Sequence, residues 1–160
     1  MAVTISIETP LQDDVRTLVA HLNDHLLPLS PPEFQFKMTV EQMAGSDTTL
    51  FVARDESGRA VGMGALKVHS PELGEVKRMF TLPEVRGQRV GSQLLARIVE
   101  LARDRGINTV MLETGTGQGM AEAHRLYTRF GFTPRGPFLD YPDSEWSAFF
   151  ELPLMQEQPA

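Results

Sequence analysis

The strongest constraint on the fold is a loop rich in glycine and arginine that runs directly into an amphipathic helix. Residues 83–102 read PEVRGQRVGSQLLARIVELA, in which Val90, Leu94, Ile98 and Leu101 recur at helical spacing. A helix N-terminus offers unpaired N–H groups and a partial positive charge, and glycines before it let the backbone approach an anion closely. The sequence therefore predicts an anion site here, most simply for phosphate. An ordinary turn is the alternative.

The charge distribution favours a small anionic ligand over a long polyanion. The chain has a net charge of −6, yet residues 76–105 hold seven basic and three acidic side chains. An acidic chain with one basic segment is not expected to bind nucleic acid nonspecifically. A solvated helix face with scattered arginines is the alternative interpretation. The loop is neither a P-loop, because GK[ST] is absent, nor a dinucleotide fingerprint, because the glycine spacing differs.

Hydrophobic periodicity predicts an alternation of strands and helices along the chain. The first helix is expected to start at Thr9, with Pro10 and Gln12 completing a capping box. The remaining expected elements are a first strand at 2–8, a short helix near 39–45, strands within 49–69, a strand at 74–82, a helix from 90 to 105, a strand at 108–114, a helix at 120–130 and a last strand at 146–154. This order predicts an α/β fold with a mixed sheet and helices on both faces.

Length and composition predict a single domain over residues 1–160, with a frayed tail at 154–160. The chain has no cysteine, which excludes disulfides, thiolate nucleophiles and zinc bound by cysteine. Its start lacks a basic segment followed by an apolar run, so no signal peptide is expected. No stretch approaches the length of a membrane span. We therefore expect a cytoplasmic protein with no membrane or nucleic-acid partner.

Two motifs resemble those of the GNAT acetyltransferases. RGQRVGSQLL resembles the pyrophosphate-binding motif Q/R-x-x-G-x-G/A, in which Arg86 matches the first position and Gly91 the last. Arg89 departs from the pattern, which has glycine there. LYTRFGFTPRG resembles the second signature, L-Y-x-x-x-G-F, and LETG and GPFLDYPD resemble a bacterial branch of the superfamily. The resemblance covers most of residues 3–152 and is strongest from 74 to 134.

The resemblance implies a single-domain GNAT fold, with a mostly antiparallel mixed sheet, helices on both faces and a V-shaped opening between the strands at 74–82 and 108–113. Acetyl-CoA would bind there as co-substrate. Its pantetheine arm would contact the backbone of Met79, Phe80 and Thr81. Many relatives hold that arm with an asparagine; here either Gln118 replaces it or the contact is lost. The residues expected around the pyrophosphate are Arg86, Gly87, Gln88, Arg89, Val90, Gly91 and Ser92.

Acetyl transfer to an amine requires a base for the amine, stabilisation of the thioester oxygen and a proton for the thiolate. Tyr127 matches the tyrosine of the family motif and is the candidate acid, although packing in the core is the alternative. Glu75 and Glu113 compete as the base, with a slight preference for Glu113. A solvated carboxylate at the end of a strand is the alternative for each.

The histidines are weaker candidates. His21 and His25 have a spacing that could hold a metal, but no third ligand is evident and no metal site is expected. His69 and His124 are lesser catalytic candidates. The acceptor pocket is expected to depend on the loops at 28–38 and 135–145.

The expected function is acetyl-CoA-dependent N-acetylation of a small-molecule amine or an amino-acid-like substrate. The alternatives are a catalytically silent module with a CoA-binding or regulatory role, an acetyltransferase of protein N-termini or lysines, and a structural domain without a cofactor. The acceptor and the oligomeric state stay open, although a homodimer is the commonest closed assembly.

Overall fold

The computed structural model describes residues 2–117 and 120–154, which form one seven-stranded sheet with helices on both faces. The strands are β1 Thr4–Ile7, β2 Thr48–Arg54, β3 Ala60–Val68, β4 Leu73–Thr81, β5 Thr109–Gly115, β6 Thr133–Arg135 and β7 Ser147–Pro153. The α-helices are α1 Asp13–Leu26, α2 Val40–Met43, α3 Val90–Asp104 and α4 Ala121–Phe130. Two 3₁₀ helices, Pro32–Phe34 and Pro83–Val85, lie in the connections.

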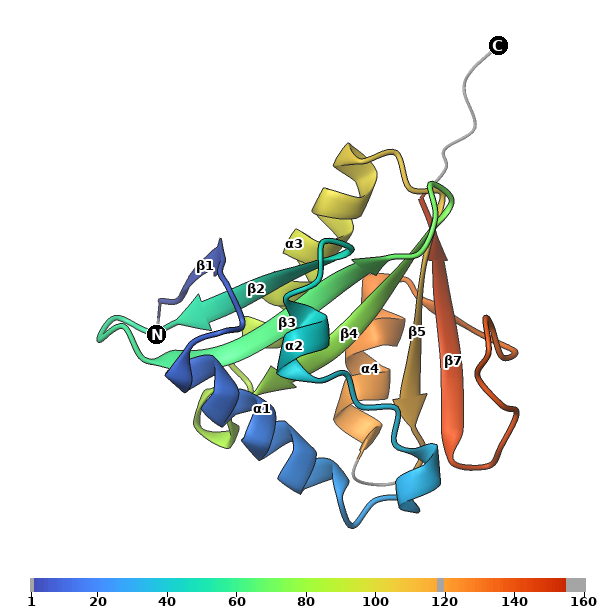
Figure 1. Ribbon diagram of the computed structural model, residues 1–160, viewed down its shortest axis with the longest axis horizontal. Helices are drawn as coiled ribbons and strands as arrows, with labels where there is room; N and C mark the ends of the chain where they lie inside the picture. Colours follow the sequence, from blue (N-terminus) through green and yellow to red (C-terminus); the bar gives the residue numbers. More distant parts are fainter. Residues whose placement is uncertain (1, 118–119, 155–160) are drawn as a thin grey trace.

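The strand order is β1-β2-β3-β4-β5-β7-β6, and every neighbouring pair is antiparallel except β4 and β5. Figure 1 shows α1 and α2 in front of the sheet and α3 and α4 behind it. The predicted mixed, mostly antiparallel sheet with helices on both faces is confirmed.

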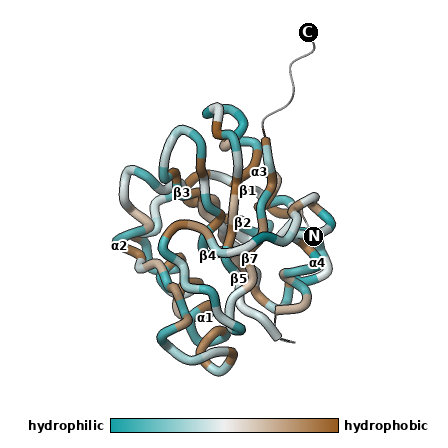
Figure 2. The backbone as a smooth tube through the Cα atoms, turned by 90° about the vertical axis from the view of Figure 1, so that its right-hand side faces the viewer, coloured by the Kyte–Doolittle hydropathy of each residue, from teal (hydrophilic) through white to brown (hydrophobic). Residues whose placement is uncertain are grey.

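The core lies between the sheet and the helices on each face. Along α1 the tube in Figure 2 alternates between apolar brown and polar teal, and Val15, Leu18 and Leu22 on its apolar side are buried. In α3, Leu94 and Ile98 are fully buried against the sheet. Both helices therefore follow the 3.6-residue period of their apolar positions.

The predicted capping box at Thr9 is wrong. The first helix begins at Asp13, and its N-cap residue Gln12 makes no side-chain cap. The Gln12 amide instead donates to the carbonyl of Thr9 at 2.8 Å, which holds the connection in a non-helical turn. A capping box does form at α2, where Thr39 and Gln42 bond to each other's backbone N–H groups.

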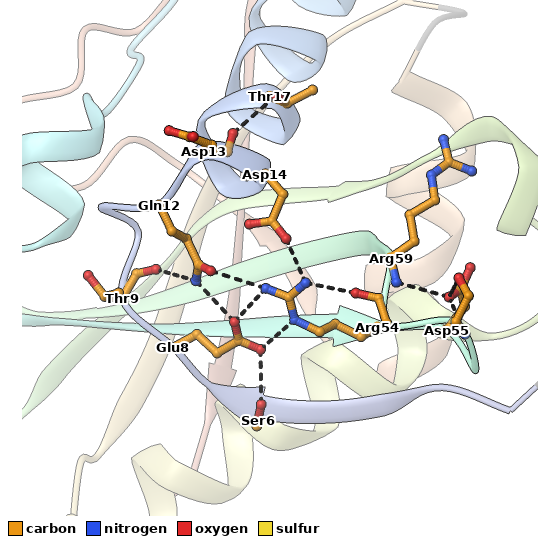
Figure 3. Close-up of polar contacts among 12 residues, drawn as sticks. Ser6, Glu8, Thr9, Gln12, Asp13, Asp14, Thr17, Arg54, Asp55 and Arg59 are labelled. Atoms are coloured by element: carbon orange, nitrogen blue, oxygen red, sulfur yellow. Dashed lines mark hydrogen bonds and ion pairs between the residues drawn. The ribbon is translucent and has the colours of Figure 1, made fainter.

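An ion-pair network holds the edge strand β1 and the start of α1 onto β2 (Figure 3). The Arg54 guanidinium donates to Glu8 at 2.7 and 3.0 Å, to Asp14 at 2.6 Å and to the Gly58 carbonyl at 2.9 Å. The hydrogen bond from Arg54 holds the pKa of the Glu8 carboxyl below its usual value. The network links residues 8–14 to residues 54–58, two segments that are distant in sequence.

A β-bulge interrupts β4. Met63 pairs with Phe80 whereas Ala65 pairs with Lys77, so Arg78 and Met79 both lie opposite the single residue Gly64. Arg78 adopts a φ of 57°, a left-handed conformation that costs a non-glycine residue about 1 kcal/mol or more. A Cβ at Gly64 would clash with the Met79 Sδ atom, so a larger residue there would displace the Met79 side chain.

The bulge corrects one expectation about β4. Strict alternation places Glu75, Lys77 and Met79 on one face of the strand and Val76 and Arg78 on the other. In the structure the four consecutive residues from 76 to 79 line one cavity. The left-handed residue rotates the backbone, so side chains that would alternate reach the same space.

β4 and β5 separate after a short parallel ladder. Their pairing covers only Leu73–Glu75 and Thr109–Met111, and Figure 1 shows the two arrows close at one end and apart at the other, with α4 behind them. A sheet strand that leaves its neighbour exposes N–H and C=O groups that need other partners. The splayed strands form the predicted V-shaped opening.

The end of the described chain is packed. Leu154 is buried, and its N–H donates to the Asn108 carbonyl at 2.7 Å; residues 155–160 of the expected tail lie outside the described range. Among residues 2–117 and 120–154, no helix has the length and apolar character needed to cross a bilayer.

Candidate active site

A large groove lies between the end of β4 and α4. Its volume is about 1010 Å³, and it is bounded by the end of α1, the end of β4, the start of α3 and the inner side of α4. Nine of the residues expected to bind the cofactor line it: Met79, Phe80, Thr81, Arg86, Gly87, Arg89, Val90, Gly91 and Ser92. Gln88 is not among the lining residues, and Gln118 lies outside the described residues.

The loop before α3 presents its backbone to this groove. Gly87 has a φ of 86°, and Arg89, the N-cap residue, has a φ of 64°. Arg89 thus takes the left-handed conformation that glycine adopts without strain, although its side chain departs from the motif. No side chain caps this end of the helix. The first N–H groups of α3 are therefore open to an external acceptor.

The groove is electropositive. Its charged lining comprises four arginines and one carboxylate: Arg86, Arg89, Arg125, Arg129 and Glu122. Two of these arginines come from the loop before α3 and two from α4, so the positive charge surrounds the groove from both sides. Together with the helix N-terminus, this arrangement can bind a polyphosphate.

Arg86 offers a direct test of the anion site. Its guanidinium donates to the Thr81 carbonyl at 3.1 Å and lies 5.8 Å from the centre of the Phe80 ring, which directs it along the groove. We expect Arg86→Glu to raise the KM for acetyl-CoA about tenfold or more and to leave kcat nearly unchanged, because it replaces an attraction by a repulsion. The effect should shrink as ionic strength rises.

The measurement is initial rate against acetyl-CoA concentration at two salt concentrations. Arg103→Glu is a matched control, because Arg103 is exposed in the last turn of the same helix and does not line the groove. Equal KM values for the two variants would contradict a phosphate contact at Arg86.

A second, smaller cavity continues from the groove on the other side of the opening. Its volume is about 130 Å³. Its walls come from the bulged part of β4, the end of β5 and the segment 29–37, which lies in the loop expected to shape the acceptor pocket. The two cavities share six lining residues: Leu22, Leu26, Met79, Met120, Ala123 and Tyr127. A group held in one cavity can therefore meet a group held in the other.

Glu113 lines the smaller cavity. The Ser147 hydroxyl donates to its Oε2 at 2.7 Å, which leaves Oε1 without a partner among the described residues. Burial raises the pKa of the Glu113 carboxyl above its usual value. A carboxylate with a raised pKa that faces a cavity has the properties of a general base.

Tyr127 lines both cavities. Its ring packs against Phe132 and Phe150, with centroids 5.9 and 6.1 Å away. The described residues provide no hydrogen-bond partner for its hydroxyl, and burial, together with the charge of Glu113, raises the pKa of Tyr127 well above its ordinary value. The hydroxyl is therefore protonated at neutral pH and able to donate. Tyr127 therefore packs in the core and also lies where the two cavities meet.

Glu75 differs from these two residues in its surroundings. It is 2% exposed and lines neither cavity. The His69 ring nitrogen Nε2 lies 2.8 Å from its Oε1, the Tyr141 hydroxyl donates to its Oε2, and Lys77 Nζ lies 3.5 Å from the same oxygen. Glu75 therefore anchors the loop at 136–146 to β4. The structure brings Glu113 and Tyr127 together around one cavity and does not bring Glu75 there.

The remaining histidines have structural surroundings. His124 Nε2 lies 2.8 Å from the Gly115 carbonyl and joins α4 to β5. His25 lines the groove near Phe80, where desolvation and the charge of Arg86 lower its pKa. His21 is exposed. Over residues 2–117 and 120–154, no three His, Cys, Asp or Glu side chains lie close enough together to hold a metal ion.

Sequence reasoning missed several residues of the site. Arg78 and Lys77 line the smaller cavity, although alternation along β4 assigns them to opposite faces. Arg125 and Arg129 line the groove from α4, and their i, i+4 spacing on one side of that helix was the available signal.

Comparisons with known proteins agree with this geometry. Residues 18–132 match the acetyltransferase (GNAT) family. The chain is 42% identical over 153 residues to the IAA acetyltransferase of Azospirillum brasilense, covering 95% of this chain and 98% of that protein. A Klebsiella pneumoniae structure assigned to the acyl-CoA N-acyltransferases is 33% identical with a TM-score of 0.78, covering 96% and 98% of the two chains.

A GNAT acetyltransferase of Elizabethkingia anophelis, solved with acetyl-CoA bound, shares the fold with a TM-score of 0.65 at 17% identity, over 95% and 98% of the chains. The groove, the family match and these relatives lead to one assignment. The chain belongs to the acetyltransferase (GNAT) family, and it is an N-acetyltransferase that uses acetyl-CoA.

Proposed function

We propose that this enzyme acetylates the amine of a small, amino-acid-like molecule, with Glu113 as general base and Tyr127 as general acid. The observation that carries this proposal is the small cavity that joins the groove at Tyr127 and is lined by Glu113. A cavity of about 130 Å³ supports a small acceptor better than a protein chain.

The groove supports a binding site for the donor. Its arginines and the N–H groups of α3 face the expected pyrophosphate, and Met79, Phe80 and Thr81 lead from there toward Tyr127. Acetyl-CoA supplies the acetyl thioester. Beyond Glu75, the backbone groups of β4 that face β5 have no partner strand. These groups would hold the pantetheine arm.

The chemistry requires two proton transfers. The acceptor loses a proton to the free oxygen of Glu113, its nitrogen forms a bond to the acetyl carbon, and the carbon–sulfur bond breaks. The Tyr127 hydroxyl donates a proton to the departing sulfur. The raised pKa of Glu113 and the raised pKa of Tyr127 suit these roles, because the first strengthens the base and the second keeps the acid protonated.

Thiol release from acetyl-CoA with a panel of amines tests the proposal, and CoA titration by calorimetry accompanies it. We expect CoA binding and turnover with at least one small amino-acid-like amine. A ligand at 100 times its Kd should also stabilise the fold by about 2.7 kcal/mol. Binding without turnover would favour a silent CoA-binding module, and faster acetylation of peptides than of small amines would favour a protein substrate.

A further inference from the structure

Arg78 is a buried cation without a counter-ion among the described residues. Its side chain is 8% exposed and lines the acceptor-side cavity. Its one hydrogen bond there goes from Nη2 to the uncharged Oδ1 of Asn23 on α1, and its Nε has no partner. A buried charge with no opposite charge nearby is strongly unfavourable, so such a residue usually serves a ligand.

The backbone also supports a functional role for Arg78. It is the left-handed residue of the β4 bulge, with a φ of 57°. This conformation is costly for a non-glycine residue. The Arg78 side chain lines the cavity together with those of Lys77 and Met79. The hydrogen bond to Asn23 on α1 then helps to hold the guanidinium in place.

The other charged groups of the cavity differ from Arg78. Lys77 Nζ donates to the Tyr141 hydroxyl at 2.9 Å and lies 3.5 Å from Glu75, so its charge is already paired. Lys37 is exposed on the loop, and Glu113 is the carboxylate assigned above to the amine. The cavity therefore contains one carboxylate for a cationic amine and one unpaired guanidinium.

We infer that the acceptor carries a carboxylate as well as the amine, and that Arg78 binds this carboxylate while Glu113 faces the amine. The inference rests on the proposed function, because it names the substrate class of the same site. An amino acid is the simplest molecule with both groups close together. An anion beside Arg78 would offset the desolvation that lowers its pKa to about 10.

The test compares amino acids with their carboxamides, which keep the amine and the side chain but lose the negative charge. For the wild-type enzyme we expect kcat/KM to be about tenfold or more higher for the acid than for the amide of each accepted pair. Equal values, or a preference for the amides, would overturn the inference while leaving acetyl transfer itself established.

Two substitutions test whether the preference for acids over amides depends on Arg78. Arg78→Gln should lower kcat/KM for the acids about tenfold or more, so that acids and amides are used equally. Asn23→Asp keeps Arg78 and gives it a carboxylate within the protein, so it should also reduce the preference for acids. Arg103→Gln is the matched control and should keep the wild-type preference. An Arg78→Gln variant that still prefers acids would contradict the assignment.

A binding measurement covers the case in which Arg78→Gln does not fold. The ¹⁵N resonance of the Arg78 side chain, assigned from its absence in Arg78→Lys, is followed in the CoA complex of the labelled wild-type protein. N-acetylglycine and N-acetylmethionine should shift this resonance, and their amides should not. No shift with either acid would overturn the inference. Failure of CoA itself to bind would instead contradict the proposed function.

Discussion

Replacing Glu113 by glutamine should lower kcat/KM for the acceptor amine about 100-fold or more, the range that loss of a general base produces. Glutamine keeps the size of the side chain and an oxygen that accepts from Ser147, so the geometry is preserved and only the proton acceptor is lost. The measurement is initial-rate kinetics over both substrates. The KM for acetyl-CoA should change little, because Glu113 does not line the groove.

The pH dependence separates a base from a binding residue. Burial raises the pKa of Glu113, so wild-type kcat/KM should rise with pH through that raised pKa as the carboxylate forms. An α-amino group titrates at about 8, so the rise in kcat/KM that its deprotonation causes should occur at higher pH. In the Glu113→Gln profile, the rise caused by the carboxylate should be absent, and the rise caused by the amine should remain. A profile identical to that of the wild type would exclude Glu113 as the base.

The substitution Glu113→Gln should lower activity without lowering the thermal stability of the protein at neutral pH. A carboxyl whose folded-state pKa is raised binds a proton more tightly in the folded state, so its contribution falls as pH increases from the unfolded pKa to the folded one. At neutral pH the ionised Glu113 therefore destabilises the fold, and glutamine removes that cost. We expect Glu113→Gln to unfold at the same temperature as the wild type or higher at pH 7, measured by thermal melting.

Glu75→Gln is the matched comparison. Glu75 accepts from Tyr141 and contacts Lys77 and His69, so glutamine leaves a partly buried lysine without its anion. Its thermal stability should fall, and its kcat/KM should fall less than that of Glu113→Gln. The reverse order of activity loss would transfer the role of base to Glu75.

Tyr127→Phe should lower kcat about 100-fold, because a positioned acid contributes a factor of this order. Phenylalanine retains the ring contacts with Phe132 and Phe150 and removes only the hydroxyl. The pKa of Tyr127 is raised, so the wild-type hydroxyl is protonated at neutral pH and can donate to the leaving sulfur. The KM for acetyl-CoA and the melting temperature should remain close to the wild-type values.

The chain contains a second tyrosine that serves as a control. Tyr141 bonds to Glu75 and lines neither cavity, so Tyr141→Phe should reduce kcat far less than Tyr127→Phe. The readout is kcat at saturating concentrations of both substrates. If the two variants have the same kcat, Tyr127 contributes packing and not proton transfer.

Local sequence patterns predicted the architecture because the patterns and the packing agree. The apolar positions of α3 recur at helical spacing, and Leu94 and Ile98 among them are buried. Gly106, predicted to end the helix, has a φ of 73°, as a C-terminal glycine is expected to have. Thr9 shows the limit of such reasoning. Its capping motif is as good locally as that of Thr39, but only Thr39 lies next to a chain segment that continues as a helix.

The site was only partly predictable, because its geometry depends on one backbone irregularity. The motifs indicated the residues around the groove, and Glu113 and Tyr127 were among the candidates. Nothing in the sequence marks Arg78 as a left-handed residue, so strict alternation placed it away from Lys77 and Met79. The burial of Glu75 depends on Tyr141, which is 66 positions away in sequence.

The short seam between β4 and β5 has a mechanical consequence. Three residue pairs, Leu73 to Glu75 with Thr109 to Met111, connect the strands β1–β4 to the strands β5–β7. Beyond this seam each strand presents a row of amide and carbonyl groups with no neighbour in the sheet. An extended molecule that occupied the gap and bonded to both rows would act as a temporary eighth strand and would stiffen the sheet.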